Sequence, residues 1–370
     1  MPPGPREPAA VQTLEWIARP TAFLRRCAAR HGEAFTLRLA FDEGPLVLVW
    51  SPQAVRAVHG ASPGVARRGE SPGALRDVAG PRSILFTDGE EHLRVRRMML
   101  PAFHGDRLRA TGPVVSEVAA EAAASWPRGR PFAALPAAQR LTLEVILRAV
   151  LGARDPVLAQ DVRRALDLTS SLPRLAALAL VRRDAGPLRP WRAFRAALAA
   201  VDARLLAHIA RRRAEGGGGD DVLGLLLEAG VDDQEARDHL VTLLAAGHET
   251  TAGTLAWALE RLARAPAWQE RAAAGEDAVL DAIVAETLRI RPVLTVAPRR
   301  LAAPLDIGEG VLPAGAHVAP CIYLLHRRAD LYPDPLAWRP ERFLERPPDS
   351  SVWIPFGGGT RRCLGAAFAQ

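Results

Sequence analysis

Apolar residues recur at helical spacing over most of the chain. This pattern predicts helical structure in four segments, which are residues 11–31, 111–230, 232–264 and 276–290. Prolines divide the second segment into shorter helices, because proline has no backbone N–H to donate inside a helix. Asp232 or Asp233 is the expected N-cap of the third segment and Pro266 marks its end, so we expect one long helix there.

Shorter apolar runs predict a smaller β portion. Residues 35–39 and 46–50 are expected to form two strands joined by a turn. Further short strands are expected at 293–297, 305–307 and 316–319. An extended arm is expected over residues 1–10 and a long loop over residues 61–83, which are rich in Gly, Pro and Ser. The sequence therefore predicts a mainly α fold with small β-sheets, in a single domain spanning residues 1–370.

The composition adds constraints on function. The chain is 49% hydrophobic and 24% charged, as in ordinary globular proteins. Its net charge of +7 comes from arginine without any lysine, and the longest cluster, Arg211–Arg213, has no aromatic residues beside it. We therefore expect no nucleic-acid binding. We also expect a cytoplasmic protein with no membrane anchor, since no segment has the pattern of a signal peptide or a membrane span.

The strongest chemical signal is the segment FGGGTRRCLG at residues 356–365. It fits the pattern F-x-x-G-x-R-x-C-x-G at its fixed positions, which are Phe356, Gly359, Arg361, Cys363 and Gly365. In this segment the chain resembles the cytochromes P450, the haem-thiolate monooxygenases. The other two cysteines, Cys27 and Cys321, have no metal-binding spacing and are expected to be buried packing residues.

The resemblance implies that Cys363 is the axial iron ligand of haem b (iron protoporphyrin IX). Glycines allow a tight turn and a close approach to a flat macrocycle. Residues 364–370 favour a helix, so Cys363 is expected near a helix N-terminus, where the helix dipole favours the thiolate. The alternative is a small packing residue in a glycine loop, since free cysteines are most often buried and inert.

A second motif, AGHETT at residues 246–251, lies inside the predicted long helix. The resemblance implies that Ala246 and Gly247 let this helix approach the haem, and that Glu249 and Thr250 supply protons as a general acid pair. The alternative is an exposed glutamate beside a threonine whose hydroxyl bonds back to the carbonyl four residues earlier. The zinc-protease pattern H-E-x-x-H is excluded because its second histidine is absent.

Charged pairs form the third set of candidates. Glu286 and Arg289 fit E-x-x-R, and the resemblance implies a buried ionic triad with Arg342 of the segment PERF. The alternative is a solvated pair on a helix surface. Glu91 and Arg94 also fit E-x-x-R, but only the later copy precedes the cysteine segment with PERF between them.

The haem carboxylates call for arginine and histidine partners. The resemblance points to His92 and Arg96, spaced as H-x-x-x-R, to Arg299 and to Arg361. Arg300 competes with Arg299 for that role. The alternatives are exposed arginines and a surface histidine.

The resemblance implies an enzyme that inserts one oxygen atom from O₂ into an apolar organic substrate. No reductase domain is present, so electrons are expected from a separate partner, a ferredoxin or flavodoxin with its reductase, docking on Arg362 and the arginines of residues 94–97. A monomer is expected. Residues 293–296 and 243–245 are expected to line an apolar substrate pocket. The alternatives are a haem-binding or sensing protein, an inactive truncated product, and a thiolate peroxygenase.

The end of the chain departs from the family pattern. Members of the family continue for several tens of residues beyond the cysteine, whereas this sequence ends at Gln370, seven residues after Cys363. We therefore expect a truncated haem domain with exposed apolar surface and weak haem retention.

Overall fold

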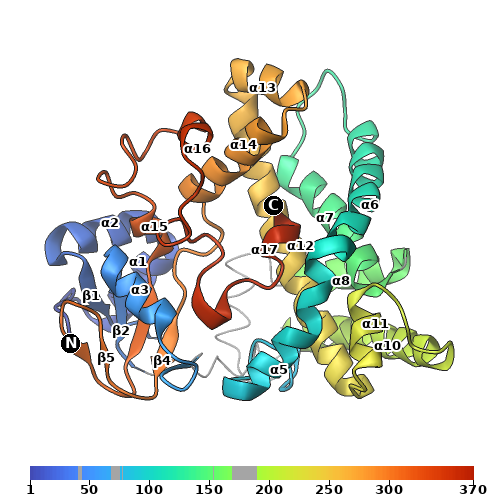
Figure 1. Ribbon diagram of the computed structural model, residues 1–370, viewed down its shortest axis with the longest axis horizontal. Coiled ribbons are helices and arrows are strands. Elements are labelled where there is room, and N and C mark those ends of the chain that lie inside the picture. Colours follow the sequence, from blue (N-terminus) through green and yellow to red (C-terminus); the bar gives the residue numbers. More distant parts are fainter. Residues whose placement is uncertain (41–43, 68–75, 77, 153, 169–189) are drawn as a thin grey trace.

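Helices make up most of the described part of the protein, and its two small sheets lie at one side (Figure 1). The computed structural model describes residues 1–40, 44–67, 76, 78–152, 154–168 and 190–370. The predicted fold class, mainly α with small β-sheets, is confirmed. Asp42 and Glu43 of the predicted turn, and residues 68–75 and 77 of the predicted loop 61–83, lie outside the described residues.

The larger sheet combines strands from the N-terminal part of the chain with strands from residues 299–320. Its strand order is β1-β2-β7-β4-β3, with β2 parallel to β7 and every other pair antiparallel. A separate hairpin pairs β5 with β6. The strands are β1 (Ala34–Leu37), β2 (Leu46–Val49), β3 (Ala66–Arg67), β4 (Arg299–Leu301), β5 (Leu305–Asp306), β6 (Val311–Leu312) and β7 (His317–Pro320).

The helices follow in chain order. They are α1 (Ala9–Ala18), α2 (Pro20–His31), α3 (Pro52–Gly60), α5 (Gly89–Met99), α6 (Gly105–Ala124), α7 (Ala134–Leu151), α8 (Pro156–Asp167), α10 (Pro190–Ala214), α11 (Val222–Glu228), α12 (Asp233–Ala263), α13 (Pro266–Ala273), α14 (Asp277–Ile290), α15 (Ile322–Leu325), α16 (Glu341–Glu345) and α17 (Ala366–Ala369). Two short 3₁₀ helices, η1 (Leu100–Phe103) and η2 (Gly359–Arg361), complete the set in the described part of the chain.

Residues 11–31 are helical as predicted, in two helices that meet at Arg19. Pro20 disfavours the helical conformation in Arg19, which adopts φ −143° and ψ 53°. One sequence-based assignment is wrong. Residues 293–297 form no strand, and the strand begins at Arg299. Pro292 and Pro298 enclose that segment and cannot donate to a strand ladder. The extended arm also ends earlier than predicted, since α1 begins at Ala9.

The long helix α12 confirms the prediction for residues 232–264. Asp232 is the N-cap, and its side-chain oxygen accepts from the backbone N–H groups of Gln234 at 3.0 Å and Glu235 at 2.9 Å. These bonds satisfy donors that the first helical turn leaves unpaired. The helix runs through the middle of the molecule and packs along α7 (Figure 1).

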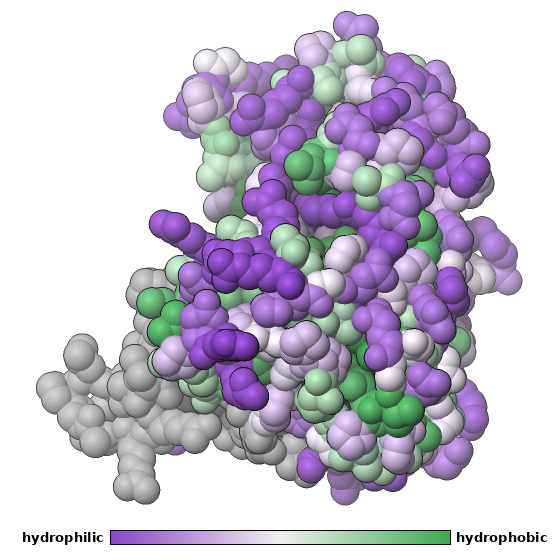
Figure 2. Space-filling model, turned by 90° about the vertical axis from the view of Figure 1, so that its left-hand side faces the viewer, coloured by the Kyte–Doolittle hydropathy of each residue, from purple (hydrophilic) through white to green (hydrophobic). Residues whose placement is uncertain are grey.

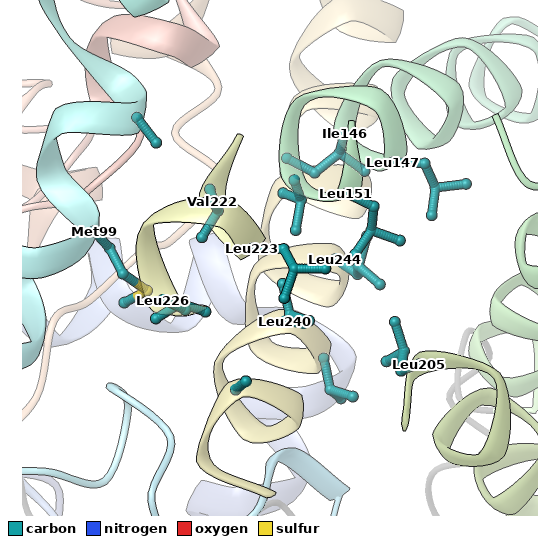
Figure 3. Packing of buried hydrophobic residues seen from close by; sticks show 14 of the residues in the cluster. Met99, Ile146, Leu147, Leu151, Leu205, Val222, Leu223, Leu226, Leu240 and Leu244 are labelled. Atoms are coloured by element: carbon teal, nitrogen blue, oxygen red, sulfur yellow. The ribbon is translucent and has the colours of Figure 1, made fainter. Parts of the chain in front are cut away.

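The main hydrophobic core surrounds the first half of α12. Leucine and valine side chains from α7, α11 and α12 point toward one another, with Met99 of α5 beside them (Figure 3). Leu244 is only 2% exposed and belongs to this core, so its predicted place in a substrate pocket is wrong. A second cluster lies against the sheet and contains Cys27 and Cys321. Both cysteines are buried, which confirms their packing role.

The surface mixes polar and apolar residues. The face seen in Figure 2 is mostly hydrophilic, with apolar residues in small separate groups. Among the described residues, no helix combines the length and the apolar character that a membrane crossing needs.

A buried ion-pair group fixes α14, as the E-x-x-R motif predicts. Arg289 donates to both carboxylate oxygens of Glu286, at 2.7 and 2.8 Å. Arg342 donates from Nε to the same carboxylate at 3.2 Å. Glu286 and Arg289 are completely buried. Their structural role is therefore confirmed, and the alternative of a solvated helical pair is excluded.

Candidate haem site

The cysteine loop is a tight turn that ends next to a short helix. Gly357 and Gly359 adopt φ of +68° and +64°, which favour glycine. The backbone N–H of Cys363 donates to the carbonyl of Phe356 at 2.9 Å and closes the loop. Helix α17 starts at Ala366, so Cys363 precedes a helix N-terminus as expected.

Two of the loop glycines make room for α3. A Cβ atom on Gly358 would lie 2.2 Å from Nδ1 of His59, and one on Gly359 would lie 2.1 Å from the carbonyl oxygen of His59. His59 therefore sits directly against the cysteine loop, and no sequence motif pointed to it. Burial, with a smaller contribution from Arg299, lowers the pKa of His59 to about 4.

Cys363 differs from the other cysteines because it is exposed. Desolvation by the surrounding protein raises the pKa of its thiol. The backbone N–H of Gly365 and the charges of Arg96 and Arg362 act in the opposite direction and lower it. Bonding of the sulfur to a metal ion is the kind of contact that converts such a thiol into a thiolate.

Helix α5 brings His92 and Arg96 to the loop. Arg361 donates to Nδ1 of His92 at 2.9 Å, so the ring proton lies on Nε2, which donates to the carbonyl of Thr360 at 3.2 Å. Arg96 donates to the carbonyl of Arg362 at 2.7 Å. Burial lowers the pKa of His92, and Arg361 lowers it further. The structure therefore brings together three of the four predicted carboxylate partners.

The positive charge of this group is only partly balanced in the described structure. Arg361 donates to Asp88 and to the carbonyl of Thr87. Desolvation nevertheless lowers the pKa of both Arg361 and Arg96. Arg299 donates to the carbonyl of Pro298 at 2.9 Å. An arginine and histidine group with one nearby carboxylate favours a further anion.

The AGHETT segment lies on α12 as predicted, with its residues on different faces. Ala246 is exposed. Gly247 faces α7, because a Cβ atom there would lie 2.8 Å from Cδ1 of Ile146. The missing side chain of Gly247 therefore serves the contact between two helices.

Glu249 and Thr250 make the contacts expected for the alternative of an exposed glutamate beside a threonine that bonds back to its own helix. Thr250 donates from its hydroxyl to the carbonyl of Ala246 at 2.5 Å. Gln139 of α7 donates from Nε2 to both carboxylate oxygens of Glu249, at 2.9 and 3.1 Å. The Glu249 side chain is 46% exposed. The catalytic roles of these two residues stay predictions.

The predicted apolar lining divides into exposed and packed residues. Val293 is 41% exposed and Leu294 58% exposed, directly after α14. Ala245 is exposed as well. Val296 is half-buried and packs in part against the cluster beside the sheet, so its place in a pocket stays a prediction.

Haem fits this donor set. Its iron needs an accessible thiol, and Cys363 is the exposed cysteine. Its carboxylates need cationic partners, and Arg96, Arg361 and His92 form a desolvated positive group beside that thiol. Small exposed side chains on α12, such as Ala246, leave space for a flat ring.

Comparisons with known proteins agree with this geometry. The family model "Cytochrome P450" matches residues 2–370. "Putative cytochrome P450 135B1" of Mycobacterium tuberculosis is 40% identical over all of this chain and 82% of its own length. "Putative cytochrome P450 138" of Mycobacterium bovis is 37% identical over all of this chain and 86% of its own length.

Solved structures show the same fold. CYP175A1 from Thermus thermophilus has a TM-score of 0.79 at 29% identity, covering 97% of this chain and 86% of that one. The retinoic acid-bound cyanobacterial CYP120A1 has a TM-score of 0.86 at 24% identity, covering 100% of this chain and 88% of that one, and supports the fold alone. The chain therefore belongs to the cytochrome P450 family.

Proposed function

We propose that the protein is a haem-thiolate monooxygenase that inserts one oxygen atom from O₂ into an apolar organic substrate. The observation that carries the proposal is the exposed Cys363 in a glycine turn, beside the desolvated Arg96, Arg361 and His92 group. When bound, haem b supplies the oxygen chemistry, with an electron-rich thiolate favouring O–O cleavage.

The protein's own residues hold the cofactor in this proposal. Cys363 binds the iron, and its thiolate is stabilised by the backbone N–H of Gly365 and by Arg96. His92, Arg96, Arg361 and Arg299 hold the carboxylates. Phe356 and Gly359 shape the turn, and Ala246 lets α12 lie close to the ring face. Gly247 faces α7 instead, so the expected contact of Gly247 with the ring is not kept.

Glu249 and Thr250 hold and move protons in this proposal. Gln139 donates two hydrogen bonds to the Glu249 carboxylate, which leaves its other lone pairs open to solvent. Thr250 holds its hydroxyl against the carbonyl of Ala246. A solvent-exposed acid one residue from a fixed hydroxyl is a suitable route for protons into a site that excludes bulk water.

Electrons come from a separate protein, such as a ferredoxin or a flavodoxin. Arg97 of α5 and Arg362 of the cysteine loop are exposed, and Arg96 joins these two elements. Arg94 is also exposed, but it is paired with Glu91 and Glu235. A positive face favours an acidic partner and speeds its association at low salt. Neutralising Arg97 and Arg362 together is expected to slow electron transfer and to flatten its salt dependence. An unchanged salt profile contradicts this docking face.

The difference spectrum of the reduced, carbon monoxide-treated protein tests the proposal. We expect a strongly red-shifted Soret band that Cys363→Ser abolishes. Cys321→Ser is the matched control and is expected to keep the band, because Cys321 is buried against the sheet. A band at shorter wavelength in the unmodified protein, or equal loss in both variants, refutes the thiolate assignment. Product formation with a supplied electron donor then tests oxygen insertion itself.

A further inference from the structure

Residues 78–88, which we name the bridging segment, lie between α12 and the cysteine loop. The segment runs directly into α5, whose N-cap is Asp88. It is held by side chains of α12 on one side and by Arg361 on the other. These contacts connect the helix to the loop through residues 80–88, which form no helix or strand.

The α12 side centres on Asp238, which is completely buried. Its Oδ2 accepts from the backbone N–H of Arg82 at 3.1 Å. Its Oδ1 accepts from Nε2 of Gln234 at 3.2 Å and from Nη1 of Arg237 at 3.0 Å. A buried carboxylate is costly unless donors satisfy its oxygens, and here one of those donors belongs to the bridging segment.

The segment approaches the carboxylate too closely for any side chain. A Cβ atom on Gly80 would lie 2.0 Å from Cγ of Asp238, and Gly80 has φ of +84°. Arg237 extends the contact, since it donates to the carbonyl of Val78 at 3.1 Å and to Asp202 of α10 at 2.8 Å. The start of the segment is therefore fixed against two helices.

Two more hydrogen bonds continue along α12. The hydroxyls of Ser83 and Thr242 are 2.6 Å apart, and Thr242 donates to the carbonyl of Asp238 at 2.8 Å, so Ser83 is the donor to Thr242. The backbone N–H of Ile84 donates to Nδ1 of His239 at 3.3 Å. Thr242 and His239, the two α12 residues in these contacts, are both buried.

The opposite side of the segment holds the cysteine loop. Arg361 donates to the carbonyl of Ile84 at 3.3 Å, and also to the carbonyl of Thr87 and the carboxylate of Asp88. The same guanidinium donates to His92. Ile84 is thus bound through its N–H to α12 and through its carbonyl to Arg361.

We propose that Asp238 is a positioning residue which, through the bridging segment, holds Arg361 and His92 in place at the cysteine loop. Removal of one partner from a buried ionic network leaves the others unsatisfied, so the network fixes the groups that it joins. The inference rests on the proposed function, in which Arg361 and His92 hold the haem carboxylates.

Amide hydrogen exchange of the purified protein, read by mass spectrometry, tests the connection. In Asp238→Asn the amide nitrogen cannot accept a hydrogen bond. Either the backbone N–H of Arg82 or the two donors Gln234 and Arg237 therefore lose their acceptor. Exchange over residues 82–88 and over residues 359–363 is expected to speed up together by about tenfold or more, because hydrogen bonds to charged groups are the strong ones. Asp233→Asn is the matched control, since Asp233 also lies on α12 and joins it to Arg213 of α10, but at the surface.

Two further variants keep the test decisive. Gly80→Ala pushes against the Asp238 carboxylate without changing any charge, and is expected to give the same exchange pattern. Thr242→Val removes the hydrogen bond from Ser83 and the bond from Thr242 to the carbonyl of Asp238, and serves if Asp238→Asn does not accumulate as folded protein. Faster exchange confined to residues 78–82, or unchanged exchange in all three variants, overturns the proposal.

Haem transfer to an acceptor protein provides the second readout. Asp238→Asn is expected to release haem about tenfold faster than Asp233→Asn, since loosened cationic partners hold the carboxylates less firmly. Equal release rates overturn the proposal. A failure of the proposed function can be distinguished from a failure of this proposal. The first appears as a missing red-shifted band in the unmodified protein, whereas the exchange experiment needs no haem.

Discussion

The two E-x-x-R motifs allow a direct test of how burial determines the strength of an ion pair. Glu286 and Arg289 are completely buried, whereas the side chains of Glu91 and Arg94 are 51% and 47% exposed. Both pairs have the same spacing on a helix. The same substitution, glutamate to glutamine, can therefore be made in each place.

The structure sets the expected magnitudes. The Glu286 carboxylate accepts from Arg289, from Nε of Arg342 and from the backbone N–H of Arg339 at 2.8 Å. Glu286→Gln leaves the buried Arg289 guanidinium without its counter-ion, which costs about 3–5 kcal/mol of unfolding free energy. Glu91→Gln affects a solvated pair and is expected to cost at most about 1 kcal/mol.

Urea unfolding at neutral pH, followed by far-UV circular dichroism, measures both variants against the unmodified protein. Glu286→Asp, which keeps the charge, is the fallback if Glu286→Gln yields no folded protein. A difference between the two glutamine variants below about 1 kcal/mol refutes the reasoning, because burial would then have no effect on the pair.

Three further predictions concern stability. His326 is buried, its Nε2 accepts from the backbone N–H of Ile354 at 2.9 Å, and burial lowers its pKa to about 3. The unfolded chain binds a proton below about pH 6.5 and the folded chain does not, so acidification from pH 7.5 to 5 is expected to remove about 2 kcal/mol through this residue. His326→Asn should reduce the pH slope of urea unfolding, and an unchanged slope contradicts the assignment. Gly358→Ala places a Cβ atom 2.2 Å from His59 and is expected to lower both the melting temperature and the haem content. Gly112→Ala, in open space on α6, is its matched control and should stabilise the protein by about 1 kcal/mol, so equal losses of stability refute the steric argument.

The sequence alone determined the elements whose signals are local. Asp232 and Pro266 delimit α12 because capping and helix termination depend on neighbouring residues. The cysteine loop was equally visible, since its glycines are needed where the backbone has positive φ. The E-x-x-R pair was identified by its order relative to the cysteine segment, and the structure buries it as expected.

Other features depended on contacts between distant segments. Residues 293–297 have the composition of a strand, but strand formation needs a partner ladder, which begins only at Arg299. Leu244 is as apolar as a pocket residue and is buried in the core instead, because helix packing decides which face of α12 meets α7 and α11.

His59, Gly80 and Asp238 carry no sequence motif. The contact of His59 with the cysteine loop joins residues about 300 positions apart, and Asp238 reaches Gly80 across more than 150 positions. A local pattern records the propensity of a segment and the face it can bury. Which buried polar group meets which backbone is decided only when the chain folds, because each such group must find its hydrogen-bond partner in the tertiary structure.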